Sequence, residues 1–180
     1  MVFFSTLFAS VLGFILGIIV TVTSPTGLRP NIFIYKSLDV IINVLRSFPF
    51  IILIVFIIPL TRAIVGTPIG ETAAIVPLTI AAAPFVARII ESALKEVDPG
   101  VIEAAKSFGA SNLQIIFKVM LKEAVPAIIS GLTLTIINII GYSAMAGSVG
   151  AGGLGKVAIS YGYQSCLLYT SPSPRDVEES

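Results

Sequence analysis

Long apolar stretches with few charges dominate the chain, and their length predicts helices that cross a membrane. Phe3 to Thr23 contains no charged residue and suffices for one crossing, which needs about 20 residues. Met1 leads directly into this stretch without a basic segment, so the pattern favours a retained span over a cleaved signal peptide. A second span is predicted from Asp39 to Leu60, closed by Pro59.

Two more spans follow in the second half of the chain. Thr72 to Ala87 is uncharged and contains Pro77 and Pro84, and Ile89 and Ile90 can extend this span. Each proline removes a backbone hydrogen bond, so we expect kinks there that neighbouring helices compensate. The fourth span is predicted from Ala127 to about Gly147, and the glycine-rich remainder up to Gly155 is interpreted as a loop.

The positions of the basic residues predict which loops face the cytoplasm, where Lys and Arg are enriched. The predicted second loop holds only Arg62. Basic residues gather around the first loop, at Arg29, Lys36 and Arg46, and in or beside the third, at Arg88, Lys95, Lys106, Lys118 and Lys122. We therefore expect the first and third loops to be cytoplasmic and the N-terminus to lie outside.

The overall composition supports a membrane protein and excludes several other classes. Of the 180 residues, 56% are hydrophobic and 12% are charged, which is more apolar surface than one soluble core can hide. A net charge of +1 gives no reason to expect a nucleic-acid partner. The single Cys166 and the lack of His exclude a disulfide framework, a Cys-based metal site and histidine-dependent catalysis.

A polar segment between the third and fourth spans predicts a bend between two helices. Asp98 followed by Pro99 is typical of a helix start, because Asp caps the N-terminus and proline fits the first turn. Gly109 suits the left-handed conformation found just past a helix end. Ser111 and Gln114 have the spacing of a capping box that opens the next helix.

This helical elbow has side chains that suit close contact with another protein. Ala104, Ala105 and Gly109 are small enough to admit another backbone, and Phe108 offers an aromatic anchor. Spacing alone leaves two interpretations open, a connector between two spans and a docking site for a partner outside the membrane.

The elbow also resembles a known motif. Glu103, Ala104 and Ala105, three intervening residues, Gly109 and then an apolar stretch resemble the EAA loop of binding-protein-dependent ABC importer permeases. In that family the loop is the coupling helix, which sits in a cleft of a separate ATPase subunit. The resemblance implies ATPase-coupling roles for Glu103, Ala104, Ala105, Phe108, Gly109, Ala110 and Ser111.

Further blocks resemble the permeases of methionine importers within that family, over roughly the first 164 residues. The blocks are Arg46 to Leu53, Ala73 to Thr79, Ala82 to Arg88 and Gly141 to Gly147. One departure bears on the exit angle of the coupling segment. Lys122 stands where the family usually has proline, although Pro126 can still start the fourth span.

The resemblance implies an all-α, polytopic membrane helical bundle with five spans, four of them in this sequence, in the inner membrane of a bacterium. It implies a homodimer, in contact with lipid, that works with two copies of an ABC ATPase subunit and an extracellular or periplasmic substrate-binding protein. The cargo would be D- or L-methionine, moved into the cytoplasm by alternating access. ATP and Mg would be bound by the ATPase, and this chain would need no cofactor and no metal. A permease for another amino acid or small polar solute is the alternative.

A glycine-rich run raises the question of whether this chain binds ATP itself. Gly150 to Lys156 has the glycine and lysine spacing of a phosphate-binding loop, but Val157 stands where that motif needs Ser or Thr to hold magnesium. The motif also needs a preceding buried strand, whereas this run follows a predicted membrane span. A flexible loop at the mouth of the pathway, or an ordinary connection, fits the run better.

Polar and aromatic side chains in the predicted spans are candidates for lining a solute path. The candidates are Ser47, Phe48, Asn138, Tyr142, Ser143 and Met145. Packing is the alternative for each, because Ser and Asn also bind neighbouring helices through hydrogen bonds and methionine commonly fills apolar cores.

Other classes of function compete with a permease. Ion-coupled carriers and channels place charges inside the membrane, and the predicted span interiors are nearly free of them. An intramembrane enzyme needs a nucleophile with a base, or a metal pair, and the sequence has no clustered Asp and no His. A membrane scaffold that recruits a protein through the elbow stays open.

The composition changes abruptly after Gln164. Residues 165–180 resemble a translated sequencing adaptor, and a native disordered tail rich in Ser and Pro is the alternative. We therefore predict a permease domain over residues 1–164, with the coupling loop at about 95–125. The family resemblance implies a fifth span beyond this domain and additional residues before Met1.

Overall fold

The computed structural model describes residues 1–152, 156–157 and 160–161. Helices joined by short connections make up this part of the chain. They are α1 (Val2–Thr23), α2 (Ile32–Ser47), α3 (Phe50–Phe56), α4 (Ile58–Val65), α5 (Glu71–Lys95), α6 (Pro99–Ser107), α7 (Asn112–Gln114), the π-helical η1 (Ile115–Met120), α8 (Leu121–Ala146) and the π-helical η2 (Gly147–Ala151). The predicted all-α bundle is confirmed, while the sequence interpreted as a tail, 165–180, lies outside the described residues.

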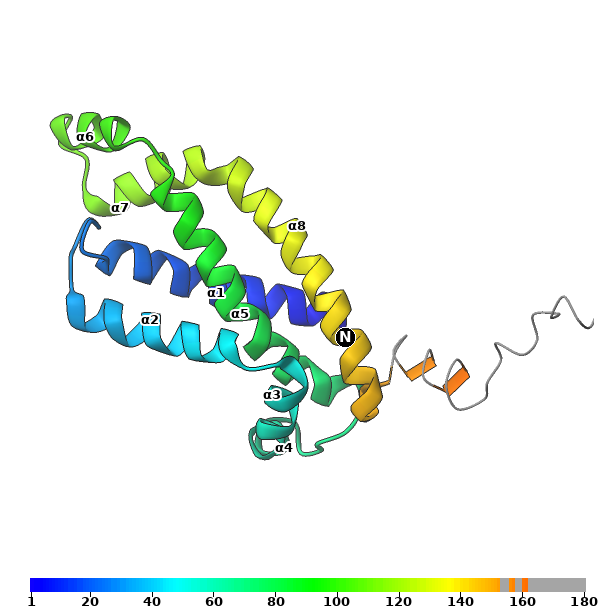
Figure 1. The fold of residues 1–180 in the computed structure, drawn as a ribbon. Coiled ribbons are helices and arrows are strands. Elements are labelled where there is room, and N and C mark those ends of the chain that lie inside the picture. The colour runs from blue at the N-terminus through cyan, green and yellow to red at the C-terminus, as the bar shows by residue number, and fades with distance from the viewer. Residues whose placement is uncertain (153–155, 158–159, 162–180) are drawn as a thin grey trace, which may run out of the picture.

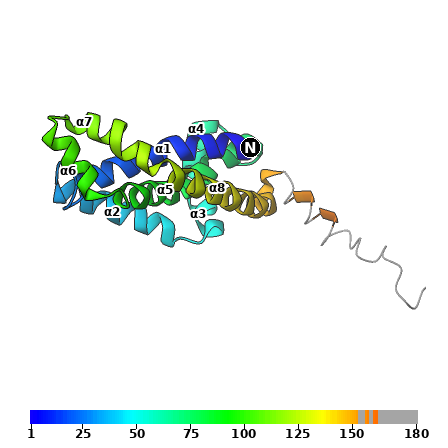
Figure 2. The ribbon, with the colours of Figure 1, turned by 90° about the horizontal axis from the view of Figure 1, so that it is seen from above.

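Helix α5 is the central element of the bundle. In Figure 1, α1, α2 and α8 lie around it, and Figure 2 shows the same arrangement from above. Within α5, 61% of the apolar window is buried, against 22% in α1 and 22% in the continuous helix over 112–146. The outer helices therefore present large apolar side chains outward, as expected of surfaces that face lipid.

Two glycines allow α1 to approach α5 closely. A Cβ atom at Gly17 would lie 2.6 Å from Ile90 Cβ, and one at Gly13 would lie 2.7 Å from the carbonyl oxygen of Ala83. Both distances are shorter than any real Cβ contact. Small residues at a helix interface permit this approach in membranes, so the α1–α5 contact depends on both positions.

The second predicted span is the one whose course differs most from the expectation. It begins at Ile32 instead of Asp39, and α2 and α3 form a pair bent by 108°. The bend lies at Phe48 and Pro49, since proline lacks the N–H for the helix and disfavours helical backbone in the residue before it. Phe48 is accordingly extended, with φ −76° and ψ 128°. The predicted end of this span at Pro59 is wrong, because Pro59 lies in the first turn of α4.

The other spans are longer than predicted. Helix α5 continues past the predicted extension at Ile90 to Lys95, with Pro77 and Pro84 inside it. The fourth span starts at Asn112 and runs through η1 into α8, so Pro126 lies inside α8 and does not begin it. Gly147–Ala151 is π-helical rather than a loop, and residues 153–155 of the glycine-rich run lie outside the described part.

Among the described residues, three helices are long and apolar enough to cross a membrane: α1, α5 and the helix over 112–146. The bent α2–α3 pair makes a fourth if it counts as one span. The elbow at α6 lies at one end of the bundle, whereas α3, α4 and the N-terminus lie at the other (Figures 1 and 2).

Candidate functional site

The elbow is built by local rules that its sequence satisfies. The carboxylate of Asp98 accepts a hydrogen bond of 2.7 Å from the backbone N–H of Gly100, and Pro99 occupies the first helical position. At the other end, the N–H of Gly109 donates to the carbonyl of Lys106 and that of Ala110 to the carbonyl of Ala105. This pair of bonds is a Schellman motif, which uses the left-handed φ of 77° at Gly109.

The second helix of the elbow starts with the predicted capping box. The backbone N–H of Ser111 donates to Gln114 Oε1 at 2.9 Å, and the backbone N–H of Gln114 donates to Ser111 Oγ at 3.4 Å. The reciprocal bonds satisfy donors that a helix start leaves free. From there α7, η1 and α8 run on as one continuous helix over 112–146.

The outer face of the elbow is exposed, and its inner face rests on the bundle. Ile102, Ala105 and Ala110 pack against a buried cluster formed by α5 and η1. Phe108 is 91% exposed, and Glu103 and Ala104 are also exposed. The structure therefore brings the predicted coupling residues together in one protruding segment, with a large aromatic side chain that nothing in the described chain covers.

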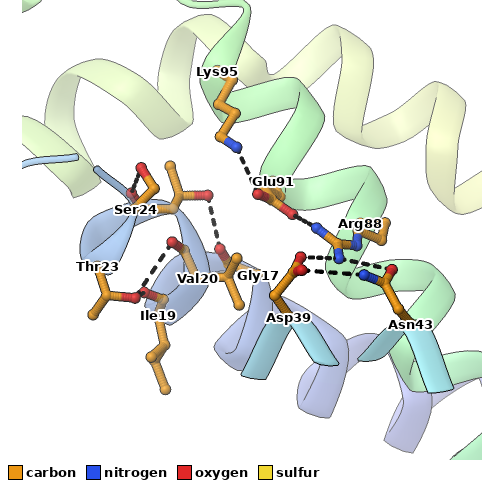
Figure 3. Close-up of polar contacts among 11 residues, drawn as sticks. Gly17, Ile19, Val20, Thr23, Ser24, Asp39, Asn43, Arg88, Glu91 and Lys95 are labelled. Carbon is orange, nitrogen blue, oxygen red and sulfur yellow. Dashed lines mark hydrogen bonds and ion pairs between the residues drawn. The ribbon is translucent and has the colours of Figure 1, made fainter. Parts of the chain in front are cut away.

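A cavity of about 270 Å³ lies beneath the elbow. Glu103 and Lys106 line it from α6, and Thr21, Ser24 and Gly27 line it from the end of α1 and the loop after it. The hydroxyls of Thr21 and Ser24 donate to backbone carbonyls of α1 itself, at 2.8 and 2.9 Å (Figure 3). These hydroxyls thus stabilise the end of α1 rather than offer free donors to a ligand.

A second cavity, of about 170 Å³, contains three of the six candidates for a solute path. Phe48 from the α2–α3 break and Asn138 and Tyr142 from α8 line it together. The Tyr142 ring stacks on Phe50 with 4.7 Å between the ring centroids. The break at Pro49 is what places an aromatic cluster next to α8.

The remaining candidates lie elsewhere. Ser47 is exposed, and its hydroxyl donates to the carbonyl oxygen of Asn43 at 2.8 Å. Ser143 is buried at 8% exposure, and Met145 is exposed on α8. Neither of the two α8 residues is among those lining the 170 Å³ cavity, so the structure does not gather all six candidates at one site.

An ionic network between α2 and α5 was not predicted from the sequence (Figure 3). Arg88 on α5 donates to Asp39 on α2, to Asn43 Oδ1 at 2.9 Å and to Glu91 Oε2 at 2.5 Å. Lys95 donates to the other oxygen of Glu91 at 2.6 Å. Glu91 is only 4% exposed, so each charge that the fold buries here has a partner.

The network lies in the last part of α5, beyond the uncharged run Thr72 to Ala87. Arg88, Glu91 and Lys95 all belong to α5, which continues past the predicted extension of the third span to Ile90. Arg88 lies three residues before Glu91 and Lys95 lies four residues after it, which are the spacings of ion pairs on one helix face. This part of the network could therefore have been predicted from the sequence. The partner Asp39, 49 residues before Arg88, had no comparable signal.

Comparison with known proteins decides the family. The family model described as "Binding-protein-dependent transport system inner membrane component" matches residues 6–165. The chain belongs to this family. Of its curated relatives, a protein of Vibrio cholerae named "Probable D-methionine transport system permease protein MetI" is 57% identical over 152 residues, covering 84% of this chain and 68% of the relative.

Other members of the family agree with this match. The protein of the same name from Pasteurella multocida is 50% identical over 167 residues, which cover 93% of this chain and 77% of that protein. Among solved structures, a chain from "Inward facing conformations of the MetNI methionine ABC transporter" is 50% identical with a TM-score of 0.88. That match covers 91% of this inner membrane component and 76% of the solved chain.

Proposed function

We propose that the chain is the membrane-spanning permease subunit of an ATP-driven ABC importer for methionine. One observation carries the proposal. Over the 91% of this chain that is aligned, the sequence is 50% identical to a chain from a methionine ABC transporter, and the fold agrees with a TM-score of 0.88. Curated relatives named as D-methionine permeases support the same cargo, with D- and L-methionine both within the proposal.

Coupling to a partner is proposed for the elbow, within a loop over about 95–125. The residues assigned to it are Glu103, Ala104, Ala105, Phe108, Gly109, Ala110 and Ser111. The exposure of Glu103, Ala104 and Phe108 at the tip of the bundle supports this role, as does the capped, continuous helix that follows. In the proposal, closure of two ATPase subunits moves the elbow, and the bundle alternates between inward-open and outward-open states.

The chain itself performs no chemistry in this proposal. ATP and magnesium are bound by the ATPase subunits, a second copy of this chain completes the membrane part, and an external or periplasmic binding protein delivers the solute. The elbow and the N-terminus lie at opposite ends of the bundle. If the elbow contacts a cytoplasmic ATPase, the N-terminus at the opposite end lies outside the inner membrane. The permease domain in this proposal comprises residues 1–164.

Uptake into vesicles tests the proposal. The chain is reconstituted with its neighbouring ATPase subunit and binding protein, and labelled methionine is supplied outside with ATP inside. We expect ATP-dependent uptake that unlabelled methionine competes away. An assembled complex that hydrolyses ATP but takes up another amino acid would overturn methionine as the cargo, and uptake without any ATPase would point to a carrier or channel.

A further inference from the structure

Arg46 is a charged residue that the ionic network leaves out. It lies in the last turn of α2, directly before the break at Phe48 and Pro49. Its guanidinium is exposed, and it has no hydrogen bond or ion pair to any residue within the described ranges. The nearby acids Asp39 and Glu91 are already bound to Arg88 and Lys95.

Arg46 falls inside the second predicted span, Asp39 to Leu60, and was counted among the basic residues around the first loop. The structure places it at the wall of the 170 Å³ cavity. Ala81 and Phe85 of α5 line that cavity too, and at 1.5 Å per residue they lie roughly 21 and 15 Å from the end of α5 at Lys95. The cavity therefore lies within the depth of the span.

An unpaired guanidinium at this depth needs an anionic or aqueous partner. Charged side chains within membrane spans are costly, and they pair or face a solute pathway. Arg46 is the only charged residue among those that line this cavity. Arg46 and Phe85 also line an adjacent cavity of about 350 Å³, together with Arg88 and the exposed Glu96. Glu96 makes no ion pair with Arg46 in the described structure. Since Arg88 has its own carboxylates, Arg46 is the cation left free to bind a passing anion.

The rest of the cavity suits the other parts of an amino acid. Asn138 and Tyr142 provide neutral oxygen acceptors for an ammonium group. Phe48, Phe85 and Leu53 provide aromatic and aliphatic surface for an apolar side chain, and thioether sulfur interacts favourably with aromatic rings. The cavity volume is about 170 Å³. This is several times the volume of roughly 30 Å³ that one water molecule occupies in the liquid.

We propose that Arg46 binds the carboxylate of the transported amino acid in a transient site within the membrane, formed by the 170 Å³ cavity. The ligand class is a zwitterionic α-amino acid with an apolar side chain. A guanidinium can hold a carboxylate through two parallel hydrogen bonds. This inference rests on the proposed function, because it assumes that an amino acid crosses the bundle.

The main experiment compares variants in the complete transporter, reconstituted with its ATPase and binding protein. Arg46→Met removes the charge and keeps much of the side-chain length, while Arg46→Lys keeps the charge. Arg62→Met is the matched control, because Arg62 is an exposed arginine on α4 that lines neither cavity. Methionine uptake and ATP hydrolysis stimulated by the binding protein are both measured.

We expect Arg46→Met to lower uptake about tenfold or more, as for the loss of a charged hydrogen-bond pair, with stimulated ATP hydrolysis retained. Arg46→Lys should recover a large part of the uptake, and Arg62→Met should match the wild type. Wild-type uptake at full rate in Arg46→Met would overturn the role of Arg46 and leave the permease function intact. Wild-type complexes that do not take up methionine would overturn the proposed function, and this site with it.

Photolabelling keeps the proposal testable if Arg46→Met fails to assemble. A diazirine analogue of methionine is illuminated with the wild-type complex during ATP hydrolysis, and the labelled peptides are identified. We expect labels, competed by methionine, at residues 45–53 or 138–142. Labels confined to other parts of the chain would contradict the site.

Discussion

Arg88 on α5 donates a hydrogen bond to Asp39 on α2, across 49 residues of sequence. The same guanidinium also binds Glu91, whose side chain is 5% exposed. Together with the hydrogen bond from Arg88 to Asn43, this contact links the central helix to the broken span. It holds α2 against α5 near the elbow end of the bundle, while the break at Pro49 lets α3 diverge at the other end.

Replacing Arg88 by Gln should destabilise the protein by about 3 kcal/mol, because it leaves Asp39 and the buried Glu91 without their main cation. The free energy of unfolding in mixed micelles measures the change. Asp39→Asn is the control: Arg88 can still donate to the amide oxygen, so a smaller loss of about 1 kcal/mol is expected. Equal stability of Arg88→Gln and the wild type would show that the network contributes nothing to the fold.

Gly17→Ala should separate α1 from α5. The added Cβ would lie 2.6 Å from Ile90 Cβ and 2.8 Å from the carbonyl oxygen of Ala87, and the backbone oxygen cannot move without shifting α5. Overpacking of this kind costs about 1–3 kcal/mol, which a lowered melting temperature of the purified protein would report.

Gly141→Ala is the matched control for that substitution. A Cβ at Gly141 meets nothing within 4 Å, and Ala favours a helix over Gly by roughly 1 kcal/mol. Gly141→Ala should therefore leave the melting temperature unchanged or raise it. If both variants lost stability equally, the loss would not stem from the α1–α5 contact.

The parts of the structure that the sequence predicts well are those governed by rules acting over a few residues. Asp98, Gly109 and the Ser111–Gln114 pair form caps and a helix end whose donors and acceptors are close in the chain. Each can be recognised without knowing the fold. The long apolar segments could be predicted for the same reason, because the length and hydropathy needed to cross a membrane are properties of each segment alone.

The course of the second span and the charged contacts depend on tertiary structure and were harder to predict. Pro49 was visible, yet the apolar run continued on both sides of it and favoured one straight helix. Arg88 was interpreted as the boundary of an uncharged run, and Arg46 as a basic residue of the second span beside the first loop. Nothing local shows that Asp39 reaches Arg88 or that Arg46 faces a cavity. Such contacts arise only when α2, α5 and α8 are packed together.

Gly109 should tolerate Asn better than Val. With φ of 77°, the position costs an ordinary L-residue about 1–2 kcal/mol, whereas Asn adopts this region more readily. No atom lies within 4 Å of a Cβ there, so within this chain the two substitutions differ only in the backbone strain that they introduce. In the reconstituted transporter we expect uptake to persist in Gly109→Asn and to be lost in Gly109→Val, with membrane insertion intact in both. Full uptake in Gly109→Val would count against the elbow as the coupling element.

Phe108→Ala tests the anchor directly. Its side chain is 91% exposed, so truncation should change the stability of this chain by less than about 0.5 kcal/mol. If the ring fills a pocket of the ATPase subunit, the affinity for that subunit should fall by about tenfold or more, as for interface hot spots, and co-purification with titrated ATPase measures it. Phe3→Ala, at a position 73% exposed near the N-terminus, removes the same ring at the end of the bundle opposite the elbow (Figure 1) and should leave the affinity unchanged. Equal affinities for all three proteins would place the ATPase contact elsewhere on the bundle.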